Sequence, residues 1–228
     1  MTWANRPYRG KGEYYANITY LDAQIGRVLA LLEQKQLLDK TLIIFSSDND
    51  PVTVEATEPW ELSMAGETGG LRGKKRFLYE GGIRVPGIIR FPGIAPAGTV
   101  LHTPASVLDL MPTIAAITGA AMPDDRPIDG MSLLPLITGE THHRTRPMYW
   151  SLPTPDGMEY AIRDGDWNLI LDGLGTTRHL YNLADDFYEL RNKLDVLPDK
   201  VAELKLMFEQ YRRDVDSDPI MRARVIRE

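Results

Sequence analysis

A short apolar segment that ends abruptly in polar residues constrains the fold of this chain more than any other feature. Residues 41–45 read Thr-Leu-Ile-Ile-Phe, and residues 46–51 read Ser-Ser-Asp-Asn-Asp-Pro. A short apolar run without alternation is typical of a strand that is buried on both faces of a parallel sheet. Ligands of open α/β sheets gather at the carboxyl ends of such strands. We therefore expect an α/β fold in which Asp48 and Asn49 are placed to be functional.

The segments on either side of this strand have the patterns of helices and a second strand. Apolar residues recur at steps of three and four along 13–38 and along 106–118, which predicts one helix in each range. Gly119 is a suitable C-terminal cap for the second helix. Residues 79–91 turn through two glycines into another apolar strand, and residues 52–74 lack a clear period, which predicts a long loop.

From about residue 145 the pattern changes to short strands. The candidates are 149–150, 160–163, 167–171 and 179–183. Asp164-Gly165 is a tight hairpin signal, and a charged helix is expected near 198–213. We therefore expect two domains, with 1–144 forming part of an α/β domain and 145–228 forming an antiparallel sheet with a helix.

The composition excludes several kinds of site. The chain has no cysteine, which rules out disulfides, zinc–thiolate sites and cysteine nucleophiles. The formal net charge is −6 and no basic tract stands out, so nucleic acid is not an expected partner. No apolar run is long enough to cross a bilayer. The first residues lack the apolar core of a signal peptide, and the compartment stays open.

Two small groups of residues have the chemistry of a binding site. Asp48 and Asn49 offer hard oxygen ligands suited to Ca²⁺ or Mg²⁺, although Asp and Asn are also common in ordinary turns. Lys74 and Lys75 lie in a basic cluster at 71–76, at the end of the glycine-rich loop. Such a cluster suits an anion such as sulfate or phosphate, and a solvated surface run is the alternative.

These segments also follow the order of a known family. The motifs are Ser-Asp-Asn at 47–49, Leu-Arg-Gly-Lys-Lys at 71–75, Tyr-Glu-Gly-Gly-Ile-Arg-Val-Pro at 79–86, Phe-Pro-Gly at 91–93, Asp-Leu-Met-Pro-Thr at 109–113, Asp-Gly-Met-Ser-Leu-Leu-Pro-Leu at 129–136 and Leu-Tyr-Asn-Leu at 180–183. From about residue 13 to about residue 213, the chain resembles the downstream half of the type I, arylsulfatase-like sulfatases of the alkaline-phosphatase-like superfamily. The resemblance implies part of the sulfatase α/β sheet with flanking helices, followed by a small C-terminal antiparallel α+β subdomain.

The resemblance also implies roles for individual residues. Asp48 and Asn49 correspond to Ca²⁺ ligands of the family, and Lys75 corresponds to its active-site lysine, with Lys74 as a weaker substrate-binding neighbour. A lysine ammonium beside a sulfate ester offsets negative charge that develops during cleavage. The family reaction is hydrolysis of a sulfuric ester, so the expected substrate is a sulfated small molecule or a sulfated glycan.

The departures from the family pattern concern the nucleophile and the rest of the metal site. The family's formylglycine is made from the first residue of a Cys/Ser-x-Pro-x-Arg motif, which lies upstream of Ser-Asp-Asn with further metal-binding aspartates and the catalytic histidines. This chain lacks that motif. Residues 151–155 read Ser-Leu-Pro-Thr-Pro, which ends in the wrong residue and lies on the wrong side of the metal strand. Asp50 stands where the family usually has glycine. We therefore expect an incomplete calcium site and a chain that is inactive alone.

Three alternatives remain at this level. The chain can be a phosphatase or phosphodiesterase relative, because the superfamily shares a metal site and fold does not settle function. It can be a non-catalytic binding or assembly module. It can also be one product of a split gene whose other half is encoded upstream. A partial sheet leaves an open edge, so association with a second copy or with a complementary N-terminal half is expected.

Overall fold

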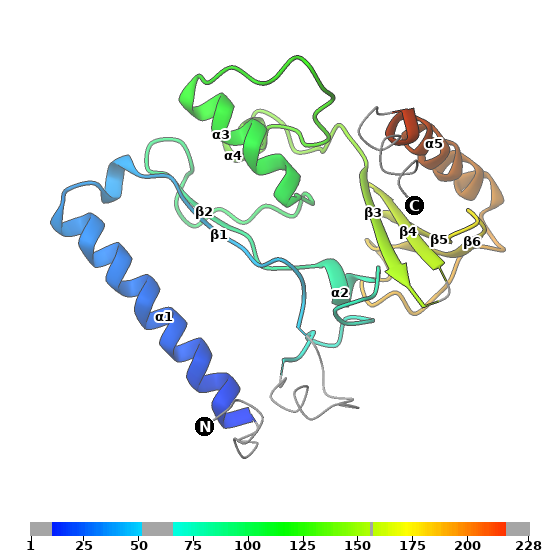
Figure 1. Ribbon diagram of the computed structural model, residues 1–228, viewed down its shortest axis with the longest axis horizontal. Coiled ribbons are helices and arrows are strands. Elements are labelled where there is room, and N and C mark those ends of the chain that lie inside the picture. Colours follow the sequence, from blue (N-terminus) through cyan, green and yellow to red (C-terminus); the bar gives the residue numbers. More distant parts are fainter. Residues whose placement is uncertain (1–10, 52–65, 156, 218–228) are drawn as a thin grey trace, which may run out of the picture. The chain divides into compact units, whose positions relative to one another are not determined.

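The protein is described by a computed structural model that covers residues 11–51, 66–155 and 157–217. The chain divides into two compact units, Met1–His143 and Arg144–Glu228. Figure 1 shows the helices and strands of each unit. Within the described ranges, no helix is long and apolar enough to cross a membrane.

The first unit combines several helices with a two-stranded sheet. Its elements in chain order are α1 (Lys11–Gln34), a 3-10 helix (Leu38–Lys40), β1 (Ile43–Phe45), α2 (Glu80–Ile83), β2 (Ile88–Arg90), a second 3-10 helix (Val107–Asp109), α3 (Leu110–Thr118) and α4 (Leu134–Ile137). The mixed α/β character expected from the sequence is confirmed.

Strand β1 differs from its sequence-based expectation. It pairs antiparallel with β2, with Ile43 opposite Arg90 and Phe45 opposite Ile88. Phe45 and Ile88 are both exposed, so the strand is not buried on both faces. Among the described residues β2 is its only strand partner. The prediction of a parallel, doubly covered strand was wrong for this part of the chain, because an apolar run carries no information about the direction of its neighbour.

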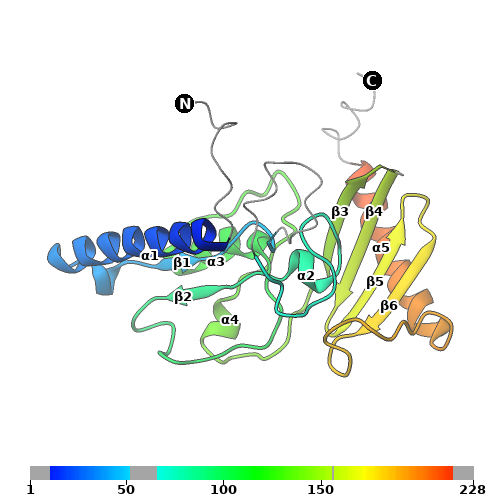
Figure 2. The same cartoon turned by 90° about the horizontal axis from the view of Figure 1, so that it is seen from below.

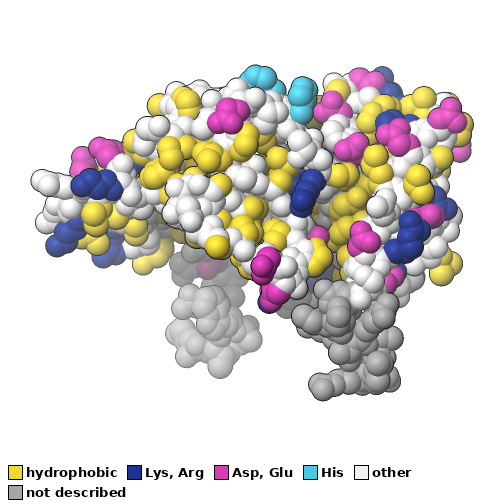
Figure 3. Space-filling model, turned by 90° about the horizontal axis from the view of Figure 1, so that it is seen from above, with side chains coloured by type: hydrophobic (Ala, Val, Ile, Leu, Met, Phe, Trp, Pro, Cys, Tyr) yellow, Lys and Arg dark blue, Asp and Glu magenta, His cyan; other side chains and the backbone are white. Residues whose placement is uncertain are grey.

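Helix α1 forms as expected but ends four residues earlier than predicted. The break follows Gln34, and Gln36 adopts a left-handed backbone conformation with φ of 56°. The helix half-buries one apolar side, yet several large apolar side chains on it are exposed: Tyr15, Ile18, Leu21, Val28 and Leu31. In the space-filling view, hydrophobic side chains reach the surface at many places between charged ones (Figure 3).

A buried aspartate joins helix α3 to the segment that precedes α4. One carboxylate oxygen of Asp109 accepts a hydrogen bond from the backbone N–H of Ser106 (2.7 Å), and the other accepts one from Met131 (2.8 Å). The hydroxyl of Thr113 accepts from the N–H of Leu133 at 2.8 Å. These bonds explain the Asp-Leu-Met-Pro-Thr and Asp-Gly-Met-Ser motifs as parts of one structural joint. The C-terminal cap at Gly119, with φ of 71°, is confirmed.

The second unit is a four-stranded antiparallel sheet covered by one helix. The strands lie in the order β3 (Met148–Thr154), β4 (Gly157–Asp164), β5 (Trp167–Asp172) and β6 (Thr177–Asn182), and α5 spans Pro198–Ser217. Figure 2 shows α5 along one face of this sheet. The predicted strands, the Asp164-Gly165 hairpin and the final helix are confirmed.

The core of this unit lies between the sheet and α5. It contains Ile162, Leu169, Leu171, Leu180, Leu204 and Phe208. Burying apolar side chains on one face of a sheet against a helix is the main source of stability for such a layer. Strand β3 forms an edge of the sheet, and Pro153 within it pairs with Met158 of β4. A proline is tolerated there because an edge strand has N–H groups that need no partner in the sheet.

Candidate functional site

The polar loop after β1 is held by a chain of local hydrogen bonds. The hydroxyl of Ser47 donates to the carbonyl of Asn49 (3.1 Å), and the N–H of Asn49 donates to Oδ1 of Asp48 (3.0 Å). The side-chain amide nitrogen of Asn49, Nδ2, donates to the backbone carbonyl of Asp50 at 2.9 Å. Asp48 remains exposed and Asn49 is half-buried. The loop therefore presents a solvent-accessible carboxylate next to an amide whose orientation is fixed.

Two backbone hydrogen bonds bring this loop to the basic segment. The N–H of Lys75 donates to the carbonyl of Pro51 (3.3 Å), and the N–H of Asp50 donates to the carbonyl of Gly82 (3.4 Å). The strand-end loop, the lysine segment and α2 are thereby neighbours although they are far apart in sequence. The structure thus brings together the segments that carry Asp48, Asn49 and Lys75. Lys74 and Lys75 are half-buried in this arrangement.

The basic segment curls tightly around the two glycines of α2. The N–H of Gly81 donates to the carbonyl of Arg72 at 2.7 Å. A Cβ at Gly81 would lie 2.5 Å from that carbonyl oxygen, and a Cβ at Gly82 would lie 2.1 Å from the carbonyl oxygen of Phe77. Only glycine leaves room for this approach. Sequence reasoning recognised the glycines as a turn but missed the helical turn that they form, Glu80–Ile83.

An aromatic side chain orders the start of the same segment. The guanidinium of Arg72 lies over the ring of Tyr79, 4.2 Å from its centroid, and donates to the Tyr79 hydroxyl at 3.4 Å. The rings of Phe77 and Tyr79 are stacked at 6.4 Å. The residue Gly66, before this segment, is buried and lies so close to Pro51 that an added Cβ would be 2.2 Å from the proline Cβ. Residues 52–65 of the predicted loop lie outside the described residues.

Two acidic residues near this loop, Asp50 and Glu80, are half-buried and buried, respectively. Glu80 is buried and forms an ion pair with Arg84 at 2.5 Å. Oδ2 of Asp50 is also buried, and no hydrogen-bond partner for it lies among the described residues. Burial raises the pKa of Asp50 above its usual value, while Arg84 lowers it in part and Glu80 raises it further. Asp50 is half-buried, whereas Asp48 is exposed.

The donor set suits a hard cation in kind but not in number. Asp48 and Asn49 supply carboxylate and amide oxygens, which Ca²⁺ prefers, whereas this ion takes six to eight oxygen ligands. Among the described residues, no cluster of three or more His, Cys, Asp or Glu side chains is able to hold a metal ion. Two such ligands fall short of that number.

Comparison with protein families gives two matches that together cover most of the chain. A family model described as "Sulfatase" matches residues 4–120. A second, described as "N-sulphoglucosamine sulphohydrolase, C-terminal", matches residues 66–214. The first match includes the strand-end loop and the lysine segment, and the second includes the four-stranded sheet.

The chain is also similar to individual proteins. The chain is 38% identical over 188 residues to a choline-sulfatase of Rhizobium meliloti (strain 1021), a match that covers 81% of this chain and 33% of the relative. It resembles the crystal structure of Ps i-CgsB with a TM-score of 0.76 at 23% identity, covering 94% of this chain and 49% of that one.

A further solved structure is a complex with its substrate, D-glucosamine-2-N,6-O-disulfate. It is 27% identical with a TM-score of 0.68, and the match covers 90% of this chain and 41% of that one. The chain covers 20% of the length of a steryl-sulfatase of Mus musculus and 33% of the length of the choline-sulfatase.

Proposed function

Because this chain belongs to the sulfatase family, we propose that it supplies the Asp48, Asn49 and Lys75 side of an active site that hydrolyses sulfuric esters. The observation that carries the proposal is the pair of backbone hydrogen bonds, Lys75 to Pro51 and Asp50 to Gly82, which joins the lysine segment and α2 to the strand-end loop. The cationic side chain of Lys75 and the hard oxygen ligands of Asp48 and Asn49 therefore extend from segments that are hydrogen-bonded to each other. The proposed domains are 1–144 for this site and 145–228 for the C-terminal subdomain.

Each residue has a defined task in this proposal. Lys75 places a positive charge beside the sulfate ester and offsets charge that develops as the ester bond breaks. Lys74 contributes more weakly to substrate binding. Asp48 and Asn49 would hold Ca²⁺, which when bound would polarise the sulfate oxygens as a Lewis acid. The tight loop around Gly81 and Gly82 fixes the backbone from which Lys75 extends.

The nucleophile is not among these residues. The formylglycine of the family arises from a Cys/Ser-x-Pro-x-Arg motif, which the 228 residues do not contain. Positioned charges have nothing to direct without a nucleophile. We therefore propose that this chain alone does not turn over sulfate esters, and that activity requires residues equivalent to that motif.

The substrate class follows from the same chemistry and from the relatives. A cationic side chain next to a calcium site suits a sulfate group on a small alcohol or a saccharide. The relatives include a choline-sulfatase and a structure with a disulfated glucosamine as substrate. We propose a sulfated small molecule or sulfated glycan.

A chimera with an active relative tests the proposed function. In the Rhizobium meliloti choline-sulfatase, the region that matches this chain over 188 residues is exchanged for the corresponding part of this chain. We expect clear hydrolysis of choline sulfate or of a generic aryl sulfate, measured by sulfate release. The hydrolysis should disappear when a chelator removes Ca²⁺ and return when the ion is restored.

The isolated 228-residue chain serves as the control for the chimera. It should release no sulfate above the buffer rate with Ca²⁺ present. A folded chimera without turnover, checked by a cooperative melting transition, would contradict the proposed function. A second chimera that exchanges only residues 46–90 separates a defect in the site from poor fitting elsewhere. Hydrolysis of phosphate esters in preference to sulfate esters would favour a phosphatase relative.

The exposed apolar surface of the first unit favours association with another chain. Helix α1 exposes Ile18, Leu21 and Val28, and β1 pairs with only one strand among the described residues. An open strand edge next to exposed apolar side chains favours pairing with another chain. We propose that this chain associates with a second copy or with a complementary N-terminal half.

Sizing chromatography with light scattering tests the association. We expect a species larger than 25.7 kDa at tens of micromolar chain. A variant with Ile18→Lys and Val28→Lys should shift it toward the monomer, because the new charges oppose burial of that helix face. The matched control, Tyr20→Lys, changes another exposed residue of α1. A monodisperse wild-type monomer that binds no hydrophobic dye would contradict association.

A further inference from the structure

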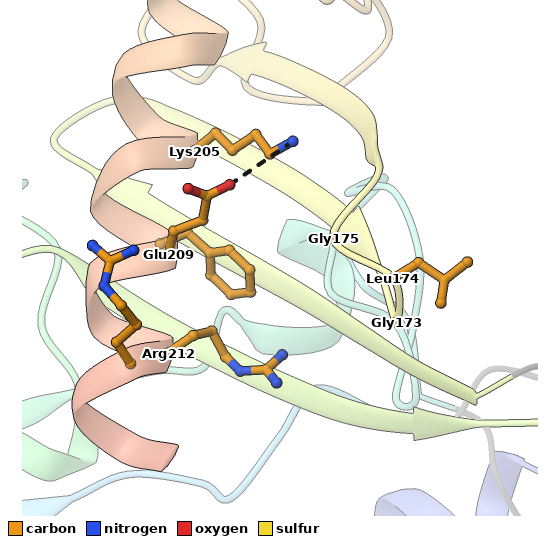
Figure 4. A pocket seen from close by; sticks show the side chains of 8 residues that line it. Gly173, Leu174, Gly175, Lys205, Glu209 and Arg212 are labelled. Carbon is orange, nitrogen blue, oxygen red and sulfur yellow. Dashed lines mark ion pairs between the residues drawn. The ribbon is translucent and has the colours of Figure 1, made fainter. Parts of the chain in front are cut away.

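The second unit carries a groove that the proposed active site does not use. It has a volume of about 330 Å³ and lies between α5 and the turn that joins β5 to β6. Its lining residues are Gly173, Leu174, Gly175, Lys205, Phe208, Glu209, Arg212 and Arg213. Figure 4 shows that Lys205, Glu209 and Arg212 extend from α5, with the glycine-containing turn opposite them. The size falls in the range of small-ligand sites.

Cationic side chains outnumber acidic ones in the lining of the groove, although the chain as a whole is acidic. Lys205, Arg212 and Arg213 line it together with a single acid, Glu209, while the formal net charge of the chain is −6. Glu209 pairs loosely with Lys205 at 3.9 Å, and Arg212 pairs with Asp216 at 3.6 Å. These long ion pairs on partly exposed side chains are weak, so an incoming anion can compete with them. Three cations at one groove favour an anionic ligand.

One arginine of the groove is positioned by aromatic rings. The guanidinium of Arg212 lies 4.6 Å from the ring centroid of Tyr160 and 6.0 Å from that of Phe208. Phe208 is buried in the core, and the neighbouring Tyr211 stacks on Tyr149 at 3.8 Å. This part of α5 is therefore held firmly against the sheet. A planar guanidinium supported in this way is suited to bind two oxygens of an oxyanion at once.

The opposite wall is formed mainly by backbone. Oδ1 of Asp172 accepts hydrogen bonds from the N–H groups of Leu174 (3.0 Å) and Thr176 (2.9 Å), which fixes the turn. Gly175 has φ of 77°, and a Cβ at Gly173 would lie 2.9 Å from the carbonyl oxygen of Met158. The N–H groups of Leu174, Gly175 and Thr176 are used within the turn, so a ligand hydroxyl would donate to its carbonyl oxygens, beside exposed Leu174. Such a wall suits a ligand with both hydroxyl groups and an apolar face.

From this arrangement we infer that the groove binds a sulfated saccharide at a second site, remote in sequence from the proposed catalytic residues. Arg212, Arg213 and Lys205 contact sulfate groups, while the turn at 173–175 contacts the sugar ring. A lone inorganic anion would leave most of the 330 Å³ unfilled. The inference goes beyond the proposed function and does not require the chain to be catalytically active.

Calorimetric titration with sucrose octasulfate, a sulfated disaccharide, tests this inference on the full chain. We expect saturable binding that a Lys205→Gln/Arg213→Gln variant weakens about tenfold or more, because two charge-assisted contacts are lost. Neither residue stacks on an aromatic ring in the described contacts, so the variant should keep the wild-type melting temperature. Glu209→Gln should strengthen binding, because it removes the single acid of the lining.

Matched controls distinguish this groove from other cationic surfaces. Lys40→Gln removes an exposed cation of the first unit that does not line the groove, and Lys200→Gln removes a cation of α5 that pairs with Glu203 and also lies outside the lining. Both variants should bind sucrose octasulfate like the wild type. Unchanged affinity in the Lys205→Gln/Arg213→Gln variant would overturn the inference, as would equally tight binding of sodium sulfate at the same ionic strength. Failure of the chimera in hydrolysis would leave this binding result unaffected.

Discussion

Replacing Lys75 with alanine in the choline-sulfatase chimera is expected to lower kcat about 100-fold or more, the size of effect seen when one electrostatic stabiliser of a transition state is removed. The physical reason is that Lys75 is proposed to face charge that grows as the ester bond breaks. KM should change less than kcat, because the interaction strengthens in the transition state. Steady-state sulfate release over a range of substrate concentrations measures both constants.

Arg76→Ala is the matched control for this substitution. It removes a cation from the adjacent position, and Arg76 is exposed. The substitution introduces no new backbone strain, since Arg76 already has a Cβ at its left-handed φ of 78°. We expect a change of no more than about threefold, typical of a screened surface charge. Equal losses in Lys75→Ala and Arg76→Ala would show that the segment acts only through its overall charge.

Replacing Gly82 with alanine should have the largest effect on stability near the site. The added Cβ would lie 2.1 Å from the carbonyl oxygen of Phe77 and 2.5 Å from that of Lys74. Both contacts are to backbone atoms, so no side-chain rotation relieves them. We expect the free energy of unfolding of the chimera to fall by about 3 kcal/mol or more, at the upper end for overpacking. Hydrolysis should fall as well, because the backbone that carries Lys75 must move.

Gly87→Ala provides the comparison for this change. Gly87 has open space around its Cα, with nothing within 4 Å of an added Cβ. Its substitution should alter the unfolding free energy by less than about 0.5 kcal/mol, as expected for an exposed site. Denaturant unfolding of the three chimeras measures the difference. A Gly82→Ala protein as stable as Gly87→Ala would contradict the close backbone packing around Gly82.

Local sequence patterns were sufficient for the elements that depend on local rules. The periodicity of α1, α3 and α5, the cap at Gly119 and the hairpin at Asp164-Gly165 all depend on neighbours within a few residues, and the structure confirms them. The direction of β1 was not predictable in this way. Its pairing depends on β2, which lies 47 positions away at the pair of Ile43 with Arg90.

The candidate site shows the same division between local and distant information. The residue types of Asp48 and Asn49 predicted binding of a metal cation, and that of Lys75 predicted binding of an anion. The backbone hydrogen bonds bring the segments that carry them together. Their individual roles stay predictions. The short helix α2 was missed because glycine has a low helix propensity, whereas Gly81 and Gly82 stand there because an added Cβ would clash with nearby carbonyl oxygens.

The groove of the second unit had no signal in the sequence. Lys205, Arg212 and Arg213 form no basic tract, and residues 173–175 read Gly-Leu-Gly. They meet only because α5 lies along the sheet at the end of the β5–β6 hairpin. A binding surface that is assembled from a helix and a distant turn emerges only when the tertiary structure is known.

The edge strand β3 has a consequence for how the protein behaves when it is produced at high concentration. Pro153 interrupts the row of N–H groups along that edge, and proline at an edge is one of the devices that discourage growth of ordered fibrils. Residues 43–45 of β1 contain only Ile, Ile and Phe, with neither proline nor charge. The two strands are therefore protected unequally against edge-to-edge association. Substitutions intended to improve the yield of soluble protein should be made in β1.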